Sequence, residues 1–286
     1  MKILVTGALG NVGSYVVEHL DQMGQKIIAA DIFIDKLTDK YQNKDNIETT
    51  FFDFTKPASF KTALKNVDCV FLMRPPHIGD PKDLLPFIKA LKTSNIKLVA
   101  FLSLMGVEKK PIPPHHKIEK LIEKHSLPYA HIRPGFFMQN LSGVHAYEIK
   151  EYDKIFIPAG KSKTSFIDAS DIALAIATVL SSPEKHTNTT YTITGPQSLN
   201  YQDVANILSD VLGRDIIYAK PSFLKYRKAY IKERGLDKSY VNITMMLYFM
   251  TRMGTAKKVT NEFELLTGKK PRTFKMFAID NKKAWK

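Results

Sequence analysis

Three glycines near the start of the chain have the spacing of a phosphate-binding turn. Gly7, Gly10 and Gly13 follow an apolar run at residues 1–6, and residues 14–23 have the apolar periodicity of a helix. In such a unit the first glycine allows a tight turn, the second lets the backbone approach a pyrophosphate, and the third lets helix and strand pack closely. The helix start also presents free N–H groups and a positive dipole end to phosphates. The alternative is a purely structural turn; the predicted dinucleotide-binding residues are Gly7, Leu9, Gly10, Asn11, Val12 and Gly13.

An acidic residue at the end of the next apolar run extends this pattern. Asp31 follows the run at residues 26–30 and stands eighteen residues after Gly13. A carboxylate at about this distance accepts hydrogen bonds from the adenosine ribose hydroxyls and repels a 2′-phosphate. No arginine stands at or next to Asp31, and the nearest base is Lys36. The sequence therefore favours NAD(H) over NADP(H), with a solvated carboxylate at a strand end as the alternative.

The third predicted strand, at residues 47–54, also ends in an acid and an aromatic residue, Asp53 and Phe54. At the carboxyl end of a parallel sheet this pair suits the amino group and the ring face of an adenine. Packing of Phe54 in the core is the alternative.

The fourth and fifth predicted strands end in further candidate cofactor contacts. Met73 and Arg74 close the fourth strand, His77 follows shortly after, and Ser103 lies at the end of the fifth. Because ligands bind beyond the carboxyl ends of such strands, we expect Arg74 and His77 near the nicotinamide end of a dinucleotide. Arg74 could hold a pyrophosphate or an acidic substrate group, or it could be a surface arginine fixed by the prolines that follow it.

The elements that position these residues alternate between strands and helices. The predicted strands span residues 1–6, 26–30, 47–54, 67–73, 97–104 and 128–135, and helices are predicted at 14–23, 57–64, 83–93 and 113–125. This alternation predicts an α/β fold with a doubly wound parallel sheet of the Rossmann type.

The domain division predicted from this pattern places a smaller mixed α/β lobe in the C-terminal part of the chain. Residues 1–140, with 164–181 returning to them, are expected to form the nucleotide-binding domain. Residues 141–163 and 182–286 are expected to form the lobe, including strands at 189–193 and 216–219.

Composition limits the partners of the chain. Its 286 residues, 44% hydrophobic and 24% charged, can bury a large core. The net charge of +14 is uneven, because residues 201–286 alone carry +10. The basic residues are scattered and no dense basic run contains interleaved aromatics, so a solvated surface is favoured over nucleic-acid binding.

Other classes of site and location are also disfavoured by the sequence. No run of eighteen apolar residues predicts a membrane span, and the N-terminus enters a strand without room for a signal peptide. The single cysteine, Cys69, lies in an apolar run, which predicts a reducing, cytoplasmic setting. His115 and His116 are adjacent on a predicted helix, and no HExxH or CxxC spacing occurs, so no metal site is expected.

Several separated motifs together resemble a known family. The opening TGxxGxxG resembles that of extended and atypical short-chain dehydrogenases/reductases. Residues 116–119, 127–140, 166–173 and 194–196 and the tail at 272–280 are similar to the NmrA-like branch of that superfamily. The resemblance spans nearly the whole chain, and the combination of motifs is specific although no single motif is.

This resemblance implies a Rossmann domain that carries NAD(P) and a small C-terminal lobe that closes over a substrate cleft. Members of the family include quinone and azo-type reductases, and also redox sensors that bind the nucleotide without turning it over. Phe136, Phe137 and Met138 follow the sixth predicted strand, where the cleft is expected. Aromatic and methionine side chains suit a planar acceptor such as a quinone, with core packing as the alternative.

The predicted catalytic region departs from the superfamily pattern. Short-chain dehydrogenases usually use a Tyr-x-x-x-Lys pair, in which the tyrosine donates a proton and the lysine lowers its pKa and holds the ribose. No tyrosine precedes Lys117 or Lys120 at that spacing. His116 could donate the proton near neutral pH and Lys117 could contact the cofactor, or both could be polar residues that open a helix.

Two functions remain after this departure. The first is an NAD(P)H-dependent oxidoreductase that transfers hydride to a small planar acceptor such as a quinone, which needs little acid catalysis. The second is a non-catalytic redox sensor that acts through a protein partner. The missing tyrosine favours the sensor, whereas the apolar residues after the sixth strand favour the enzyme.

Overall fold

The computed structural model describes residues 1–75, 78–109 and 113–286, and the chain divides into two compact units. Unit 1 contains Met1–Pro134, Ala169–Ile193 and Glu262–Lys269. Unit 2 contains Gly135–Asp168, Thr194–Asn261 and Lys270–Lys286. None of the described helices is long and apolar enough to cross a bilayer.

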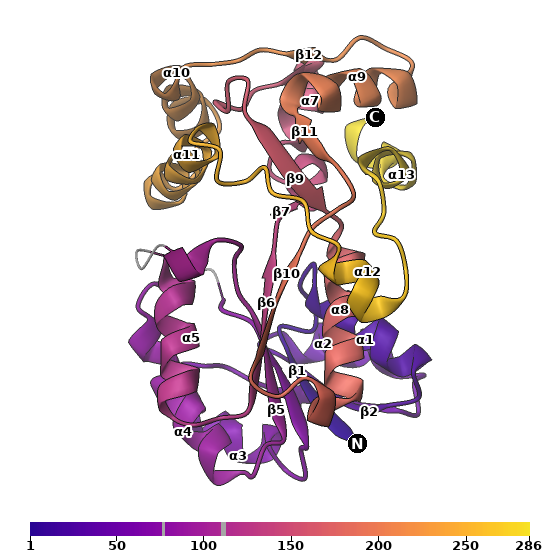
Figure 1. Cartoon of the computed structure of the whole chain (residues 1–286), viewed down its shortest axis with the longest axis vertical. Helices are drawn as coiled ribbons and strands as arrows, with labels where there is room; N and C mark the ends of the chain where they lie inside the picture. Colours follow the sequence, from indigo (N-terminus) through magenta and orange to yellow (C-terminus); the bar gives the residue numbers. More distant parts are fainter. Residues whose placement is uncertain (76–77, 110–112) are drawn as a thin grey trace. The chain divides into compact units, whose positions relative to one another are not determined.

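Unit 1 is built on a seven-stranded parallel sheet in the order β10-β6-β5-β4-β1-β2-β3 (Figure 1). The strands are β1 (Lys2–Thr6), β2 (Lys26–Asp31), β3 (Ile47–Phe51), β4 (Cys69–Leu72), β5 (Leu98–Leu102), β6 (Tyr129–Pro134) and β10 (Thr189–Ile193). The central strands β1, β4 and β5 contain continuous apolar runs because both faces of the sheet are covered, and all four residues of β4 are buried. The predicted doubly wound parallel sheet is confirmed.

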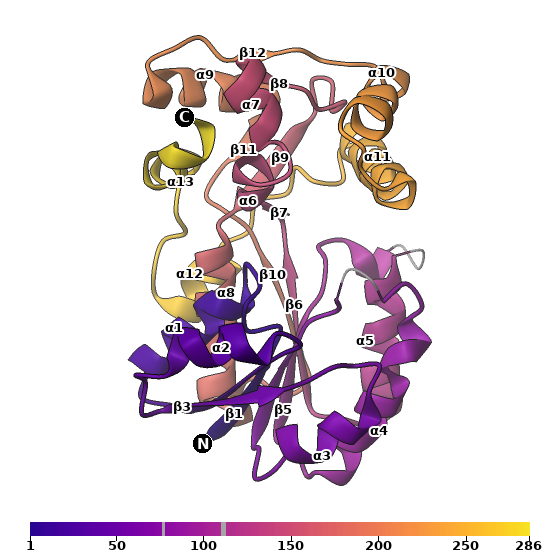
Figure 2. The same ribbon diagram turned by 180° about the vertical axis from the view of Figure 1, so that it is seen from behind.

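Helices cover both faces of this sheet (Figures 1 and 2). On one face α1 (Gly13–Gln22) packs against α8 (Ala169–Ser181), which lies on β4, β5 and β6. The other face carries α3 (Phe60–Ala63), α4 (Leu85–Thr93) and α5 (Pro114–Lys124), whose apolar residues join one buried cluster with the sheet. In the same unit α2 (Ile34–Tyr41) lies on β2 and β3, and α12 (Glu262–Thr267) lies on α8 and β10.

The domain boundaries differ from those expected at residues 135–140, 164–168, 182–193 and 262–269. β10 does not belong to the smaller unit, because it pairs in parallel with β6, from Thr189 opposite Ala130 to Ile193 opposite Pro134. Conversely, β9 (Lys163–Ile167) belongs to unit 2. The half-buried alternation of β10 suits an edge strand of either sheet, so periodicity alone does not identify its partner.

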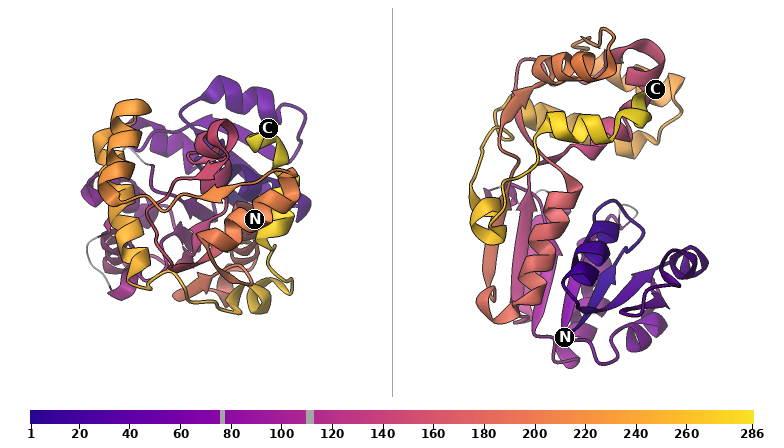
Figure 3. Two further views of the ribbon diagram at one scale, coloured as in Figure 1. Left: turned by 90° about the horizontal axis from the view of Figure 1, so that it is seen from above. Right: turned by 90° about the vertical axis from the view of Figure 1, so that its right-hand side faces the viewer.

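Unit 2 combines a three-stranded sheet, β11-β9-β7, with a two-stranded sheet, β12-β8. Its strands are β7 (Phe136–Phe137), β8 (Lys154–Ile155), β9, β11 (Ser198–Asn200) and β12 (Ile217–Tyr218). Its helices are α6 (Gln139–Ser142), α7 (Ala146–Tyr152), α9 (Tyr201–Leu212), α10 (Phe223–Lys228), α11 (Lys238–Arg252) and α13 (Phe274–Asp280). A capping box between Asn200 and Asp203 starts α9, and α10 lies beside α11 (Figure 3).

Candidate nucleotide-binding site

Each glycine of the turn that follows β1 is required for a different physical reason. Gly7 has a φ of +65°, and a Cβ atom there would lie 2.2 Å from the Met73 sulfur. A Cβ atom on Gly13 would lie 2.1 Å from the Gly7 carbonyl oxygen, so α1 can approach the turn only with glycine. A Cβ atom on Gly10 would have only that same oxygen within 4 Å among the described residues beyond its chain neighbours, at 3.1 Å. Gly10 is therefore the point where the backbone is open to a ligand.

The start of α1 suits an anion. No side chain caps this ten-residue helix, and its first turn holds no acidic residue. The positive end of its dipole therefore favours a phosphate at this point. The Gly10 amide donates to the Gly7 carbonyl at 2.9 Å and the Ser14 amide donates to the Gly10 carbonyl at 3.0 Å, which holds the turn in shape. The two neighbouring residues that were predicted to contact the dinucleotide differ in their exposure, since Asn11 is exposed and Val12 is buried.

Asp31 is tied to the glycine turn as well as being the last residue of β2. Its Oδ2 accepts a hydrogen bond from the Leu9 amide at 3.2 Å, and its Oδ1 accepts one from the Phe33 amide at 3.3 Å. Each carboxylate oxygen can accept a second hydrogen bond, so these contacts leave capacity for ribose hydroxyls. The hydrogen bond from the Leu9 amide was not predicted from the sequence. It gives Asp31 a structural role in addition to its predicted binding role.

Asp53 and Phe54 follow β3 and differ in their accessibility. The Asp53 Oδ1 accepts hydrogen bonds from the Thr55 amide at 2.8 Å and the Thr55 hydroxyl at 2.7 Å. The Phe54 side chain is buried, and its ring packs edge-on against Phe52 at 4.7 Å and Phe87 at 5.3 Å. The structure therefore favours the packing alternative for Phe54, and an adenine contact at Asp53 stays a prediction.

Met73 and Arg74 lie directly after β4. The Met73 amide donates to the Thr6 hydroxyl at 3.3 Å, which places its side chain over Gly7. The Arg74 Nη1 donates to the carbonyl oxygens of Pro75 and Ile78 at 3.2 and 2.6 Å. Burial lowers the pKa of the Arg74 guanidinium, which its own loop holds half-buried. His77 lies outside the described residues.

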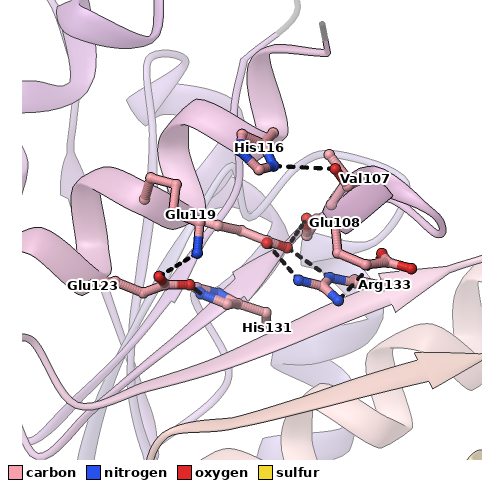
Figure 4. Close-up of polar contacts among 9 residues, drawn as sticks. Val107, Glu108, His116, Glu119, Glu123, His131 and Arg133 are labelled. Carbon is pink, nitrogen blue, oxygen red and sulfur yellow. Dashed lines mark hydrogen bonds and ion pairs between the residues drawn. The ribbon is translucent and has the colours of Figure 1, made fainter. Parts of the chain in front are cut away.

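Ser103 belongs to a buried ionic network that was not predicted from the sequence. Figure 4 shows the Glu119, Arg133 and Glu108 side chains of this network. Its hydroxyl donates to Glu119 Oε1 at 2.5 Å. Arg133 donates from Nε to the same oxygen at 2.9 Å and from Nη2 to Oε2 at 2.6 Å. Burial by itself would raise the pKa of Glu119, but the hydrogen bonds from Arg133 and Ser103 lower it below the ordinary value. The Arg133 Nη1 also lies 3.3 Å from Glu108 Oε2.

The predicted catalytic residues lie in the first turn of α5. The His116 Nδ1 lies 3.1 Å from the Val107 carbonyl oxygen, so it carries the proton and leaves Nε2 for another partner (Figure 4). Lys117 is exposed. For the neighbouring His115, burial and then Arg74 lower the pKa to about 4, and its Nδ1 has no hydrogen-bond partner among the described residues.

A second group of side chains in this network has a geometry that could hold a cation. One ligand atom from each of Glu119, Glu123 and His131 lies within 4.8 Å of the others. However, Glu119 is already paired with Arg133, and Glu123 lies 2.7 Å from the Lys120 amine. Because both carboxylates have a cationic partner, the geometry alone does not support a metal site.

The burial of His131 predicts that the folded protein loses stability at acidic pH. Its ring stacks on Tyr129 at 4.3 Å, and burial lowers its pKa from 6.5 to about 4, although Glu119 and Glu123 act to raise it. Between about pH 6.5 and 4 the unfolded chain therefore binds more protons than the folded chain, and the unfolding free energy falls as the pH falls. The unfolding free energy of the wild-type protein should therefore be lower at about pH 5 than at about pH 7.5. We expect His131→Phe to reduce this difference by about 1–2 kcal/mol. Urea unfolding at both values measures this, and an unchanged difference would contradict it.

The three predicted acceptor-binding residues lie in unit 2 and have different environments. Phe136 and Phe137 form β7, which pairs with Phe166 and Ile167 of β9, and both side chains are half-buried. Met138 is 1% exposed within the core of unit 2, so core packing accounts for it. Contacts of Phe136 and Phe137 with an acceptor stay predictions.

A doubly wound parallel sheet with this glycine turn after its first strand and an acid ending its second defines an NAD(P)-binding Rossmann-type domain. The chain belongs to the NmrA-like family, whose model matches residues 1–278. This membership confirms the resemblance drawn from the motifs.

Individual relatives match along almost the full chain. Prestalk A differentiation protein A of Dictyostelium discoideum is 31% identical, over 97% of this chain and 91% of that protein. NAD(P)H azoreductase of Xenophilus azovorans is 30% identical, over 96% of both chains. The structure of a Citrobacter sp. triphenylmethane reductase is similar with a TM-score of 0.87 and 25% identity, over 99% of this chain and 100% of that one.

Proposed function

We propose that this protein is an NAD(P)H-dependent oxidoreductase that transfers hydride to a small planar acceptor such as a quinone. The observation that carries the proposal is the open glycine turn, held by Asp31, in a chain 30% identical over 96% of its length to an NAD(P)H azoreductase. The protein's own part is to bind the nucleotide and acceptor and to supply electrostatics, since the reduced nicotinamide supplies the hydride when bound.

Several of the predicted residues have a specific role in this proposal. The glycine turn and the start of α1 bind the pyrophosphate, and Asp31 binds the adenosine ribose. His116 moves a proton at Nε2, because its Nδ1 is committed to the Val107 carbonyl. Lys117 contacts the cofactor, and Phe136 and Phe137 offer ring surfaces to a planar acceptor.

The preference for NAD(H) over NADP(H) is part of the proposal and rests on Asp31. The Citrobacter reductase has been crystallised with NADP(H), so a direct test is needed. Calorimetric titration with NAD⁺, NADH, NADP⁺ and NADPH is expected to show tighter binding of the forms without a 2′-phosphate. In Asp31→Ala the ratio of the two affinities should fall by about tenfold, because the repulsion of the 2′-phosphate is lost.

The ratio of the affinities for NAD(H) and NADP(H) remains informative even though Asp31 also accepts a hydrogen bond from the Leu9 amide. A loosened glycine turn weakens both dinucleotides together, because they share the pyrophosphate. Asp31→Asn is the matched variant, since its amide oxygen can keep one backbone contact without the negative charge. If both variants keep the wild-type ratio, Asp31 does not select the cofactor.

The proposed roles of His116 and Lys117 are tested by turnover. With NADH or NADPH and a series of quinones, His116→Ala is expected to lower kcat by about 10²-fold or more for acceptors that need a proton. Lys117→Ala should mainly raise KM for the nucleotide. His125→Ala, at the other end of α5, is the control because its Nδ1 lies 2.9 Å from the Leu121 carbonyl of its own helix. Equal activity in all variants would remove both residues from the mechanism.

A redox sensor is the second candidate, and it is favoured by Pro113 standing four positions before Lys117, where the superfamily pattern has a tyrosine. In this case the protein binds the nucleotide without turning it over and passes its redox state to a protein partner. Tight nucleotide binding together with undetectable oxidation by quinone and azo acceptors would favour the sensor.

A further inference from the structure

The hydrogen bond between Ser103 and Glu119 has only one possible direction. Glu119 is 1% exposed, is paired with Arg133 through two hydrogen bonds, and has its pKa lowered, so it is a carboxylate that can only accept. The single hydroxyl proton of Ser103 is therefore directed to Glu119 Oε1. What remains at Ser103 is the acceptor capacity of its oxygen, so any ligand group that binds there must be an N–H or O–H donor.

The sheet order indicates which part of a dinucleotide comes to Ser103. The pyrophosphate binds at the end of β1, and Asp31 at the end of β2 binds the adenosine ribose. The adenosine half therefore extends over β2, and the nicotinamide half extends to the other side of β1, over β4 and β5. Ser103 is the first residue after β5 at that same carboxyl edge. It is 4% exposed, so one ligand group is enough to cover what remains accessible.

We propose that the Ser103 oxygen accepts a hydrogen bond from the carboxamide N–H of the nicotinamide, and that Glu119 and Arg133 are positioning residues that fix its proton away from the ligand. This inference rests on the proposed function. The carboxamide is the only hydrogen-bond donor on the nicotinamide ring, which makes it the group that such an acceptor selects. Ser103 is consequently unable to donate a hydrogen bond to the oxygen of the acceptor substrate.

The test uses the acetylpyridine analogue of the cofactor, in which an acetyl group without N–H replaces the carboxamide. Calorimetric titration of the wild-type protein is expected to show about five- to tenfold weaker binding of the analogue than of the natural oxidised dinucleotide. Ser103→Ala should bind the two ligands equally, and Ser103→Thr, which keeps the hydroxyl, should restore the difference. Ser94→Ala is the control, because that hydroxyl donates a hydrogen bond to the Ala90 carbonyl of the neighbouring helix α4, at 2.8 Å.

A second variant tests the positioning residues. In Glu119→Gln the new amide can donate to Ser103, which frees the hydroxyl proton to turn toward the ligand, so the difference between the two ligands should fall below about twofold. A purely structural role of Ser103 predicts instead that both ligands weaken by the same factor in Ser103→Ala. That result, with an unchanged affinity ratio, would overturn this inference alone. A wild-type protein that binds neither ligand would overturn the proposed function as well.

Discussion

Replacing Gly10 by alanine is expected to lower the affinity for NAD(P)H by about 100-fold while the protein stays folded. Among the described residues other than its chain neighbours, the added methyl group has only the Gly7 carbonyl oxygen within 4 Å, at 3.1 Å. It would therefore occupy the space where the pyrophosphate must approach the backbone. A 100-fold loss corresponds to about 2.7 kcal/mol. Calorimetric titration measures the loss, and thermal unfolding shows whether the fold is kept.

Gly13→Ala is the matched comparison for this result. A methyl group on Gly13 would lie 2.1 Å from the Gly7 carbonyl oxygen and 2.8 Å from its carbonyl carbon, so the backbone of the turn must move. This variant should lose stability and nucleotide binding together, whereas Gly10→Ala should lose binding alone. Wild-type affinity in Gly10→Ala would show that the glycine turn is not the nucleotide site.

Arg133→Ala is expected to destabilise the protein by about 3–5 kcal/mol, because it leaves Glu119 as an uncompensated buried charge. The variant removes both hydrogen bonds that Arg133 donates to Glu119 and leaves the one from Ser103. Chemical denaturation in urea at neutral pH measures the change in unfolding free energy.

Two control variants separate the buried pair from ordinary surface charge. Lys120→Ala removes an exposed partner of Glu123 and should change the unfolding free energy by less than about 1 kcal/mol. The double variant Glu119→Gln/Arg133→Met removes both charges and should be less destabilised than Arg133→Ala alone. If Arg133→Ala lowers the unfolding free energy no more than Lys120→Ala does, the Glu119–Arg133 pair does not stabilise the fold.

Strands β1, β2, β4 and β5 of the parallel sheet could be predicted because each contains a short, buried apolar run. The same reasoning did not place β10, whose half-buried alternation fits an edge strand in either unit. Its partner β6 lies far away in sequence, and only the register of Thr189–Ile193 on Ala130–Pro134 places it in the main sheet. Periodicity identifies a strand but does not identify its neighbour.

The candidate site divides in the same way. The glycine turn and Asp31 were predictable because local spacing alone determines their geometry. The bond between Ser103 and Glu119 was not, because it depends on how α5 packs on β5 and β6. In the sequence Glu119 is one of several charged residues in an amphipathic helix, and nothing local distinguishes it from the exposed Lys120. Its burial opposite Arg133 becomes visible only in the folded unit.

Transfer of hydride from a bound nicotinamide to an acceptor is tested with a deuterium-labelled reduced cofactor. The oxidation of labelled and unlabelled NADH or NADPH by a quinone would be followed in single turnovers, with Gly10→Ala as the control. We expect protein-dependent oxidation that is slower with the label and absent in the variant. Tight binding of the nucleotide without oxidation by any quinone or azo acceptor would contradict it and identify the protein as a sensor.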